Sequence, residues 1–385
     1  MIVVECLFWF SVLSLAYNYV GFPLLMKVLS IGKKQNSICY SSKEELPVVS
    51  VLLAAYNEEE VIEEKIKSTF KTNYPLDKLE LLIGSDASTD QTDEIVKKYK
   101  RLLPSVKFQR FSGRTVKPTI IDELKKHAIG EVLVLTDANV FFEENTLFEL
   151  VKHFKNEQIG LVGGNILNLD IKKDGISNQE KQYLTIENKL KYQEGVVFGT
   201  MIGAFGGVYA IRKSQCVDVP KNYIVDDFFL TMSVLENGQS AINELDAIAY
   251  EDVSNVLSKE FARKKRISAG NFQNLNRFKH LLWPPISGLA FTFWSHKVLR
   301  WKSPFLMIIA LFTNALLLEQ VVFYQWLFFG QLLVWLCPIF DLMLGQLGIH
   351  NKLLRFVTHL FGMNLALFLG FFSFLKGIKS NVWEP

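Results

Sequence analysis

Asp137 and Asn139 stand one residue apart, directly after an aliphatic run that reads Val-Leu-Val-Leu. Both residue types are common in the polar turns that end strands, so an ordinary turn is one interpretation. The alternative is a metal-binding or phosphate-facing site at the carboxyl end of a buried strand. Which of the two holds depends on the elements that surround the pair.

Two other predicted strands also end in polar residues. Continuous apolar runs, typical of strands covered on both faces, end in Ala55-Tyr56-Asn57-Glu58 and in Ser85-Asp86. Strands alternate here with amphipathic helices, which favours an α/β fold with a mainly parallel sheet. Ligands of such sheets bind beyond the carboxyl ends of the strands. We therefore expect all three polar ends on one rim, with strands in PVVSVLLAA, LELLIG, VKFQRF and EVLVLT.

Acidic side chains gathered on one rim would repel each other unless a cation lies among them. Lys117, in the loop before a predicted helix, is one such cation. A divalent cation such as Mg2+ or Mn2+ is another, since it takes oxygen ligands and shares them with phosphates and water. The expected ligand is a nucleotide diphosphate. No Gly-x-x-x-x-Gly-Lys or Gly-x-Gly-x-x-Gly pattern follows the first strand, so an ATPase or a dinucleotide-binding protein has no support.

Apolar residues gather at the two ends of the 385-residue chain, of which 49% is hydrophobic. Ile2–Leu25, Pro304–Leu344 and Leu360–Leu375 are apolar stretches, and a bilayer-spanning helix needs about 20 such residues. We expect one transmembrane helix in residues 1–29 and about three in residues 304–385. The first stretch lacks a basic flank before it and a small-residue cleavage pattern after it, which favours a retained anchor over a signal peptide.

The central region, residues 30–279, has an ordinary soluble composition and is the expected catalytic domain. Lys27, Lys33 and Lys34 follow the first span and place this domain on the cytoplasmic side of an inner or plasma membrane. Residues 280–303 mix aromatic and basic side chains, which indicates an interfacial segment. Within it, we expect His296 to contact lipid headgroups rather than a ligand.

The overall charge and the cysteines exclude other classes of protein. A net charge of +3 is too balanced for a general nucleic-acid binder. The four cysteines have no metal-ligand spacing and are expected to be reduced packing residues.

Six segments resemble, in order and spacing, the motifs of family 2 glycosyltransferases of the GT-A fold. They are VSVLLAAYNEEEVI, GSDASTDQT, the lysine of RTVKPTII, TDANV, GAFGGVYAIRK and VDDFFL, with FARKKRISAGNFQ after them. The resemblance covers about residues 47–275. The apolar ends resemble those of membrane-bound polysaccharide synthases of the cellulose, hyaluronan and poly-N-acetylglucosamine synthase type.

This resemblance implies a nucleotide-sugar donor on the rim. The donor-binding residues would be Ala55, Tyr56, Glu58, Asp86, Lys117 and Arg266, and the divalent cation would lie at Asp137 and Asn139. The family has a second aspartate where Asn139 stands. An amide offers a carbonyl oxygen but no charge, so we expect Asp137 to contribute more to metal binding.

Asp226 and Asp227 of VDDFFL stand where the resemblance places the catalytic acids. A sugar hydroxyl that attacks an anomeric carbon needs a carboxylate to accept its proton, and the resemblance assigns this to Asp227, with Asp226 in support. The leaving diphosphate needs compensation by the cation. From the residues alone, N-capping of a helix is an equally good interpretation of the pair.

Acceptor-side residues would come from two further segments. Gly203, Gly206 and Gly207 could form a loop under the sugar or a tight turn between strands. Arg263 and Ile267 stand where processive synthases have the Gln and Trp of Gln-x-x-Arg-Trp, so the stacking platform for a growing chain is missing. The same basic helix could instead face lipid headgroups.

The sequence therefore predicts an inverting membrane glycosyltransferase that acts on a lipid-linked or glycan acceptor. A processive synthase that also translocates its polymer is the alternative within this class. A non-catalytic, membrane-anchored nucleotide-binding or assembly protein is the alternative outside it. Membrane lipids, polysaccharide-assembly proteins or a second copy of the chain are the expected further partners.

Overall fold

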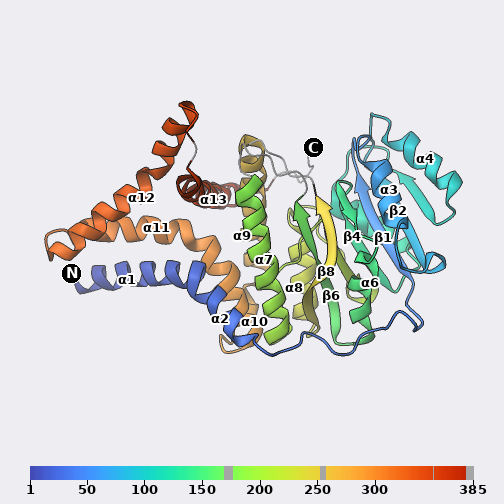
Figure 1. The fold of residues 1–385 in the computed structure, drawn as a ribbon, viewed down its shortest axis with the longest axis horizontal. Coiled ribbons are helices and arrows are strands. Elements are labelled where there is room, and N and C mark those ends of the chain that lie inside the picture. Colours follow the sequence, from blue (N-terminus) through green and yellow to red (C-terminus); the bar gives the residue numbers. More distant parts are fainter. Residues whose placement is uncertain (169–176, 252–256, 350, 379–385) are drawn as a thin grey trace.

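The computed structural model describes residues 1–168, 177–251, 257–349 and 351–378. Within these ranges, one sheet of eight strands forms the centre of the central region, in the order β3-β2-β1-β4-β7-β6-β8-β5 (Figure 1). Its strands are β1 (Val49–Ala55), β2 (Leu79–Ser85), β3 (Val106–Arg110), β4 (Val132–Thr136), β5 (Val140–Phe142), β6 (Ile159–Asn168), β7 (Val208–Arg212) and β8 (Ser240–Glu251).

The first half of the sheet, β3-β2-β1-β4, is entirely parallel, as the alternating pattern predicts. In the second half, β7 runs antiparallel to both of its neighbours, β5 runs antiparallel to β8, and β6 and β8 are parallel. The predicted α/β fold class is therefore confirmed, and the sheet is mixed beyond β4. The register pairs Ala55 with Ser85 and Leu53 with Thr136, so β1, β2 and β4 end at the same edge.

Helices cover both faces of the sheet because its strands are apolar on both sides. Every residue of β1 is buried, and its side chains alternate between two separate core clusters. One cluster takes in residues of α3 (Ile62–Phe70), α4 (Thr92–Leu102) and α6 (Thr146–Val151). The other takes in residues of α5 (Lys117–His127) and α8 (Asp226–Glu236). Pro118 in the first turn of α5 and the basic Lys125, Lys126 and His127 in its last turn suit the two ends of that helix.

Three helices are long and apolar enough to cross a membrane among the described residues, and two of them lie at the far end from the sheet (Figure 1). They are the continuous helix Ile2–Leu29, which contains α1 (Ile2–Ala16), η1 (Tyr17–Gly21) and α2 (Phe22–Leu29), together with α12 (Val322–Gln346) and α13 (Lys352–Leu375). About three spans are expected after residue 304, and α11 (Leu299–Leu316) would be the first of them in the chain. This helix packs beside α1, but it is not one of the three helices long and apolar enough to cross a membrane. The predicted domain boundaries themselves stay predictions.

Two long helices connect the sheet to the apolar end of the molecule, α7 (Ser177–Phe198) and α9 (Leu257–Phe278) (Figure 1). The side chain of Ser268 on α9 donates a 3.0 Å hydrogen bond to the carbonyl of Leu367 on α13. Phe272 and Phe371 meet edge to face, with 5.0 Å between their ring centroids. The second core cluster continues into Phe293 and Trp301, so the apolar helices share a core with the central region that contains the sheet.

The expectation that His296 contacts lipid headgroups is wrong. Its ring is fully buried in the π-helix η6 (Phe293–Val298), which follows the short helix α10 (Gly288–Thr292). The Nδ1 atom lies 2.6 Å from a carboxylate oxygen of Glu194, and the Nε2 atom lies 2.9 Å from one of Glu187. Both glutamates belong to α7, so the basic residues before α11 turn inward, toward carboxylates, rather than toward a membrane surface.

Candidate active site

The polar ends of β1, β2 and β4 lie on one rim, as the sequence predicts. The backbone N–H of Asp86 donates a 2.8 Å hydrogen bond to the carbonyl of Ala55, which joins the first two strand ends directly. We call this set of side chains the carboxyl-end rim; it consists of Ala55, Tyr56, Glu58, Asp86, Asp137 and Asn139.

Lys117 is the cation that the acidic rim requires. It is the first residue of α5, and its ammonium donates a 2.6 Å hydrogen bond to Oδ1 of Asp137. Burial lowers the pKa of Lys117, but the charges of Asp137 and then Asp226 outweigh burial, so the pKa is raised overall. Lys117 therefore stays charged and lies between the predicted metal residue and the predicted catalytic pair.

Asp226 and Asp227 begin α8, where the positive end of the helix favours acidic side chains. Oδ1 of Asp227 accepts a 2.7 Å hydrogen bond from the backbone N–H of Phe228, so this carboxylate also binds a backbone N–H in the first turn of the helix. Burial and the neighbouring charge of Asp226 raise the pKa of Asp227 to about 6. A carboxylate with that pKa accepts a proton more readily than an ordinary aspartate, as a general base should.

The glycine-rich segment ahead of β7 lies against the start of α8. A Cβ atom added at Gly206 would lie 3.0 Å from Oδ2 of Asp227, and one added at Gly203 would lie 2.6 Å from the ring of Phe228. Gly203 also has a φ of +83°, which side chains rarely adopt. Gly207 approaches the sheet instead, where an added Cβ would lie 2.8 Å from the side chain of Ile166.

Asp86, Tyr56 and Arg114 form one polar surface at the strand ends, and the sequence did not predict Arg114 as a site residue. Its carboxylate accepts hydrogen bonds from the backbone N–H of Thr115 and from Nε of Arg114, the latter at 3.1 Å. The Arg114 guanidinium lies 3.3 Å from the centroid of the Tyr56 ring. A planar cation over an aromatic ring, beside a carboxylate, is a suitable surface for a nucleoside base.

Glu58 faces the metal motif. Burial, followed by the charge of Asp137 and that of Asp90, raises the pKa of Glu58 to about 7. The backbone N–H of Glu58 donates a 2.8 Å hydrogen bond to the side chain of Thr92, which ties this loop to the first turn of α4. A cation bound at Asp137 would therefore also act on Glu58.

The predicted metal residues offer the oxygen ligands that Mg2+ or Mn2+ requires. Asp137 has a half-exposed carboxylate, and Asn139 hydrogen-bonds the side chain of Glu251 at the end of β8. Glu251 pairs with Val140 across the β5–β8 ladder, so a further carboxylate reaches the motif in which the second acid is an amide. The donor set fits a divalent cation that shares its remaining positions with phosphate and water.

The basic helix α9 brings both of its predicted arginines toward this edge of the sheet. Arg263 lies 4.0 Å from Glu251 and 3.7 Å from Glu260. Arg266 is exposed and lies within electrostatic range of Asp226 and Asp137. The assigned roles of these arginines, in acceptor and diphosphate binding, stay predictions.

Lys65 is a second residue that sequence reasoning missed. It is fully buried under the rim, and its ammonium donates hydrogen bonds to the side chain of Thr136, at 2.8 Å, and to the carbonyl of Val140, at 2.5 Å. Burial lowers its pKa, while Asp137 acts to raise it. Lys65 therefore stabilises the loop that contains Asp137 and Asn139, because it bonds a residue on each side of that loop.

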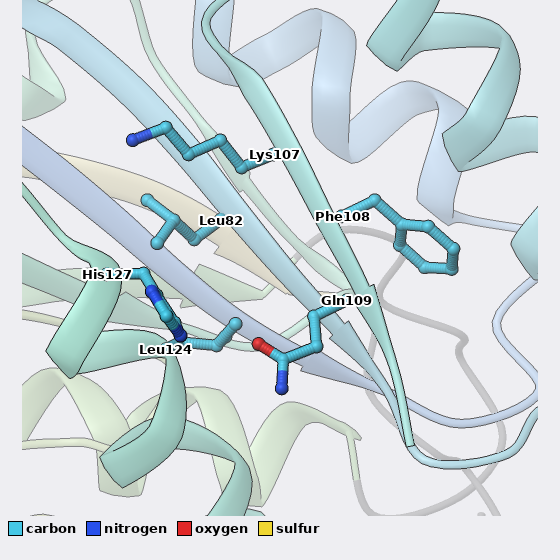
Figure 2. Close-up of a pocket in the computed structure, with 6 residues that line it drawn as sticks. All are labelled: Leu82, Lys107, Phe108, Gln109, Leu124 and His127. Carbon is cyan, nitrogen blue, oxygen red and sulfur yellow. The ribbon is translucent and has the colours of Figure 1, made fainter. Parts of the chain in front are cut away.

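Two other features lie apart from the rim. Figure 2 shows a pocket beside the edge strand, and none of the predicted site residues line it; the residues that do are Leu82, Lys107, Phe108, Gln109, Leu124 and His127. Among the described residues, a group of acids at Glu149, Glu244 and Asp246 also has the spacing of metal ligands. Glu244 of that group is already bound by Lys152 and His153, at 3.1 and 2.7 Å.

Residues 50–213 match the family described as Glycosyl transferase family 2. The whole fold is similar to that of a mannosyltransferase from Pyrobaculum calidifontis, solved with GDP-mannose and Mn2+. The TM-score is 0.71 at 20% identity, and the likeness covers 96% of this chain and 99% of the other. Residues 50–213 are thus similar to family 2 glycosyltransferases, as the resemblance of the motifs predicts, and the chain has the GT-A fold.

Curated relatives match a shorter part of the chain. A poly-β-1,6-N-acetyl-D-glucosamine synthase of Staphylococcus epidermidis is 30% identical over 32% of this chain and 30% of its own length. A β-monoglucosyldiacylglycerol synthase of Nostoc is 27% identical over 43% of this chain and 34% of its own length. The chain therefore matches about a third of each of these relatives.

Proposed function

We propose that this protein is an inverting membrane glycosyltransferase. It transfers a sugar from a nucleotide donor, UDP-linked by the resemblance of its motifs, to a lipid-linked or glycan acceptor. The observation that carries the proposal is the position of Lys117. Its ammonium bonds Asp137 and lies within electrostatic range of both Asp226 and Asp227, which brings the metal motif and the acidic pair into one site.

The reaction would be a single displacement. The acceptor hydroxyl oxygen forms a bond to the anomeric carbon of the donor sugar as the bond from that carbon to the diphosphate oxygen breaks. Asp227 accepts the hydroxyl proton, and its pKa of about 6 leaves it mostly ionised at neutral pH. Lys117 and Arg266 would stabilise the charge on the leaving diphosphate. A divalent cation at Asp137 and Asn139 supplies further compensation when bound.

Tyr56, Arg114 and Asp86 would hold the nucleoside, because they combine a ring, a planar cation and a carboxylate at the strand ends. On the acceptor side, Gly206 lets the backbone approach Asp227 closely, and Gly203 lets it approach the neighbouring Phe228. A side chain in place of Gly206 would crowd the oxygen that must reach the acceptor. The position of Arg263 beside Glu251 is compatible with a role at the same edge.

A processive polysaccharide synthase is a second candidate, supported by the Staphylococcus epidermidis relative named for polymer synthesis. Ile267, in place of the family's tryptophan, favours single addition instead. The length of the product made by the purified protein separates the two. Products longer than one added sugar, formed before the acceptor is consumed, would support the processive candidate.

The catalytic region would face the cytoplasm, because Lys27 lies in the last turn of the first span and Lys33 and Lys34 follow that span. A cysteine placed on the exposed surface of α4 should resist membrane-impermeant maleimides in intact cells. Labelling from outside would place the region on the opposite side.

The test of the proposed function is release of nucleoside diphosphate by the purified full-length protein in nanodiscs, with a panel of nucleotide sugars and Mg2+ or Mn2+. At least one donor should be turned over, and Asp137→Ala should lose metal-dependent nucleotide binding. Lys97→Ala, on an exposed face of α4, is the matched control and should behave as the parent does. If no donor is turned over, or if Asp137→Ala binds metal and nucleotide like the parent, the proposal fails and a non-catalytic assembly role takes its place.

A further inference from the structure

A cluster of charged side chains is buried where α7 meets the residues that lead into α11. Three members lie on one face of α7, at the i, i+4 and i+7 spacing of a single helix face. The other three come from η6 and the first turn of α11. We call this the junction cluster; it consists of Glu187, Lys191, Glu194, His296, Lys297 and Arg300.

Glu187 carries most of the ion pairing in the junction cluster. It accepts hydrogen bonds from His296 at 2.9 Å, from Lys297 at 2.5 Å and from Arg300 at 2.6 Å. Burial opposes its ionisation, but the nearby cations prevail and hold its pKa well below the usual value. Glu194 is also occupied, because it binds His296 and accepts a 3.1 Å hydrogen bond from the backbone N–H of Ile202.

Lys191 is left without an anion of its own. Its side chain is 2% exposed, and its ammonium lies 3.4 Å from the centroid of the Phe205 ring. In the described part of the chain, neither a carboxylate nor a hydrogen-bond acceptor lies within bonding distance of this ammonium. Burial and then the like charge of Lys297 lower the pKa of Lys191 to about 7. A buried ammonium beside a second ammonium either loses its proton or gains an anion, and an anion that joins the two lysines would keep both of them charged.

The position of Lys191 shows where such an anion would lie. Phe205 belongs to the glycine-rich segment whose Gly206 contacts Asp227, and Lys191 and Asp227 act on each other electrostatically. On its other side, the junction cluster leads directly into α11, and α7 packs against α2 in the first apolar helix. The unpaired ammonium thus lies between the candidate general base and the apolar helices.

We propose that Lys191, together with Lys297, binds a phosphate ester group on a membrane-lipid acceptor and so places the acceptor hydroxyl at Asp227. This inference rests on the proposed function and specifies the acceptor class. Phosphate is the anion that lipid headgroups present at a membrane surface, and a lysine ammonium binds it as a compact point charge. The phosphate would supply a negative charge beside Lys191, because the carboxylates of Glu187 and Glu194 are already bound by other groups.

The test measures binding of three probes to the full-length protein in detergent: dioleoyl phosphatidate, dioleoylglycerol and inorganic phosphate. Lys191→Met should weaken phosphatidate binding by about tenfold or more, because one charge-assisted contact is lost. It should leave binding of dioleoylglycerol, which has no phosphate, as it was. Lys191→Arg keeps the charge and should retain most of the affinity. Lys189→Met, at an exposed position on the same helix, is the matched control and should match the parent.

Thermal melting of the variants tests whether Lys191 has a structural role instead. Removing an unpaired buried charge should leave the melting temperature of Lys191→Met equal to or above that of the parent. A lower melting temperature, or equal phosphatidate affinity in the parent and Lys191→Met, would overturn the inference. Inorganic phosphate that binds as tightly as phosphatidate would assign the site to a free anion rather than a lipid.

The outcomes also separate this inference from the proposed function. If the parent turns over a donor but binds phosphatidate independently of Lys191, only the lipid-phosphate site is ruled out. If phosphatidate binding depends on Lys191 but no donor is turned over, only the glycosyltransferase proposal is ruled out.

Discussion

The carboxyl-end rim and the junction cluster both gather charged residues, but they balance charge in different ways. On the rim, two of the carboxylates each have a cation of their own, since Lys117 pairs with Asp137 and Arg114 with Asp86. In the junction cluster, the carboxylate of Glu187 bonds His296, Lys297 and Arg300, while Lys191 pairs with neither carboxylate. The rim is partly open, with 40% of the Asp137 side chain exposed, whereas His296 is fully buried.

The two regions are therefore suited to different roles. Side chains that pair at an accessible edge can exchange partners, so a cation and a diphosphate can take the place of the Lys117–Asp137 contact. Buried charges that share one carboxylate are costly to separate, and they fix α7 against η6. The rim is therefore suited to turnover, and the junction cluster to holding the catalytic region and the apolar helices in one arrangement.

The largest expected effect separates catalysis from binding on the rim. Asp227→Asn keeps the size of the side chain but removes the proton-accepting charge, so sugar transfer should fall about a hundred- to ten-thousand-fold. Nucleotide binding should survive, because the strand ends hold it. Parallel transfer and nucleotide-binding assays measure the two. Transfer near the parental rate would give the general-base role to Asp226 or to another residue.

The next effect concerns stability and tests the junction cluster. Glu187→Gln leaves Lys297 and Arg300 without their shared carboxylate, so the free energy of unfolding should drop by about 3–5 kcal/mol. Glu94→Gln breaks an exposed pair with Lys97 and should cost about 0.5 kcal/mol or less. Thermal melting in detergent compares the two variants. Equal losses would mean that the junction cluster contributes no more than a surface ion pair.

A smaller effect is expected in the pH dependence of transfer. Asp227 must be ionised to accept a proton, and its pKa is raised to about 6 by burial and by Asp226. The value of kcat/KM should therefore fall as the pH decreases through about 6. Asp226→Asn removes the second of these causes, so the acidic limb should move to lower pH. A limb that does not move would show that Asp226 has no electrostatic effect on the base.

The regions also differ in how well the sequence predicts them. The strands β1 to β4 and the rim follow from apolar runs with polar ends, because neighbouring parallel strands must end together. Arg114 carries no such signal: it is a single arginine in a loop, and only the fold brings it over Tyr56. Glu251 lies more than a hundred residues after Asn139, and it reaches the metal motif only through the β5–β8 pairing.

The sequence predicts the wrong surroundings for the basic residues of the junction cluster, and the reason is physical. Aromatic and basic residues before an apolar helix have the composition of a membrane-surface segment, and composition does not show which face is covered. Glu187 and Glu194 lie about a hundred residues earlier, at the spacing of an ordinary polar helix face. Only the packing of α7 against η6 reveals that the basic residues have buried carboxylate partners. The mixed half of the sheet escaped prediction similarly, because apolar runs do not specify strand direction.

The anomeric configuration of the product tests the central claim most directly, since a single displacement with Asp227 as base must invert the sugar. The product made from an α-linked UDP-sugar by the purified protein would be examined by proton NMR. A β-linked product is the predicted result. An α-linked product would contradict the account, because retention requires a different mechanism from direct attack by an acceptor hydroxyl whose proton Asp227 accepts.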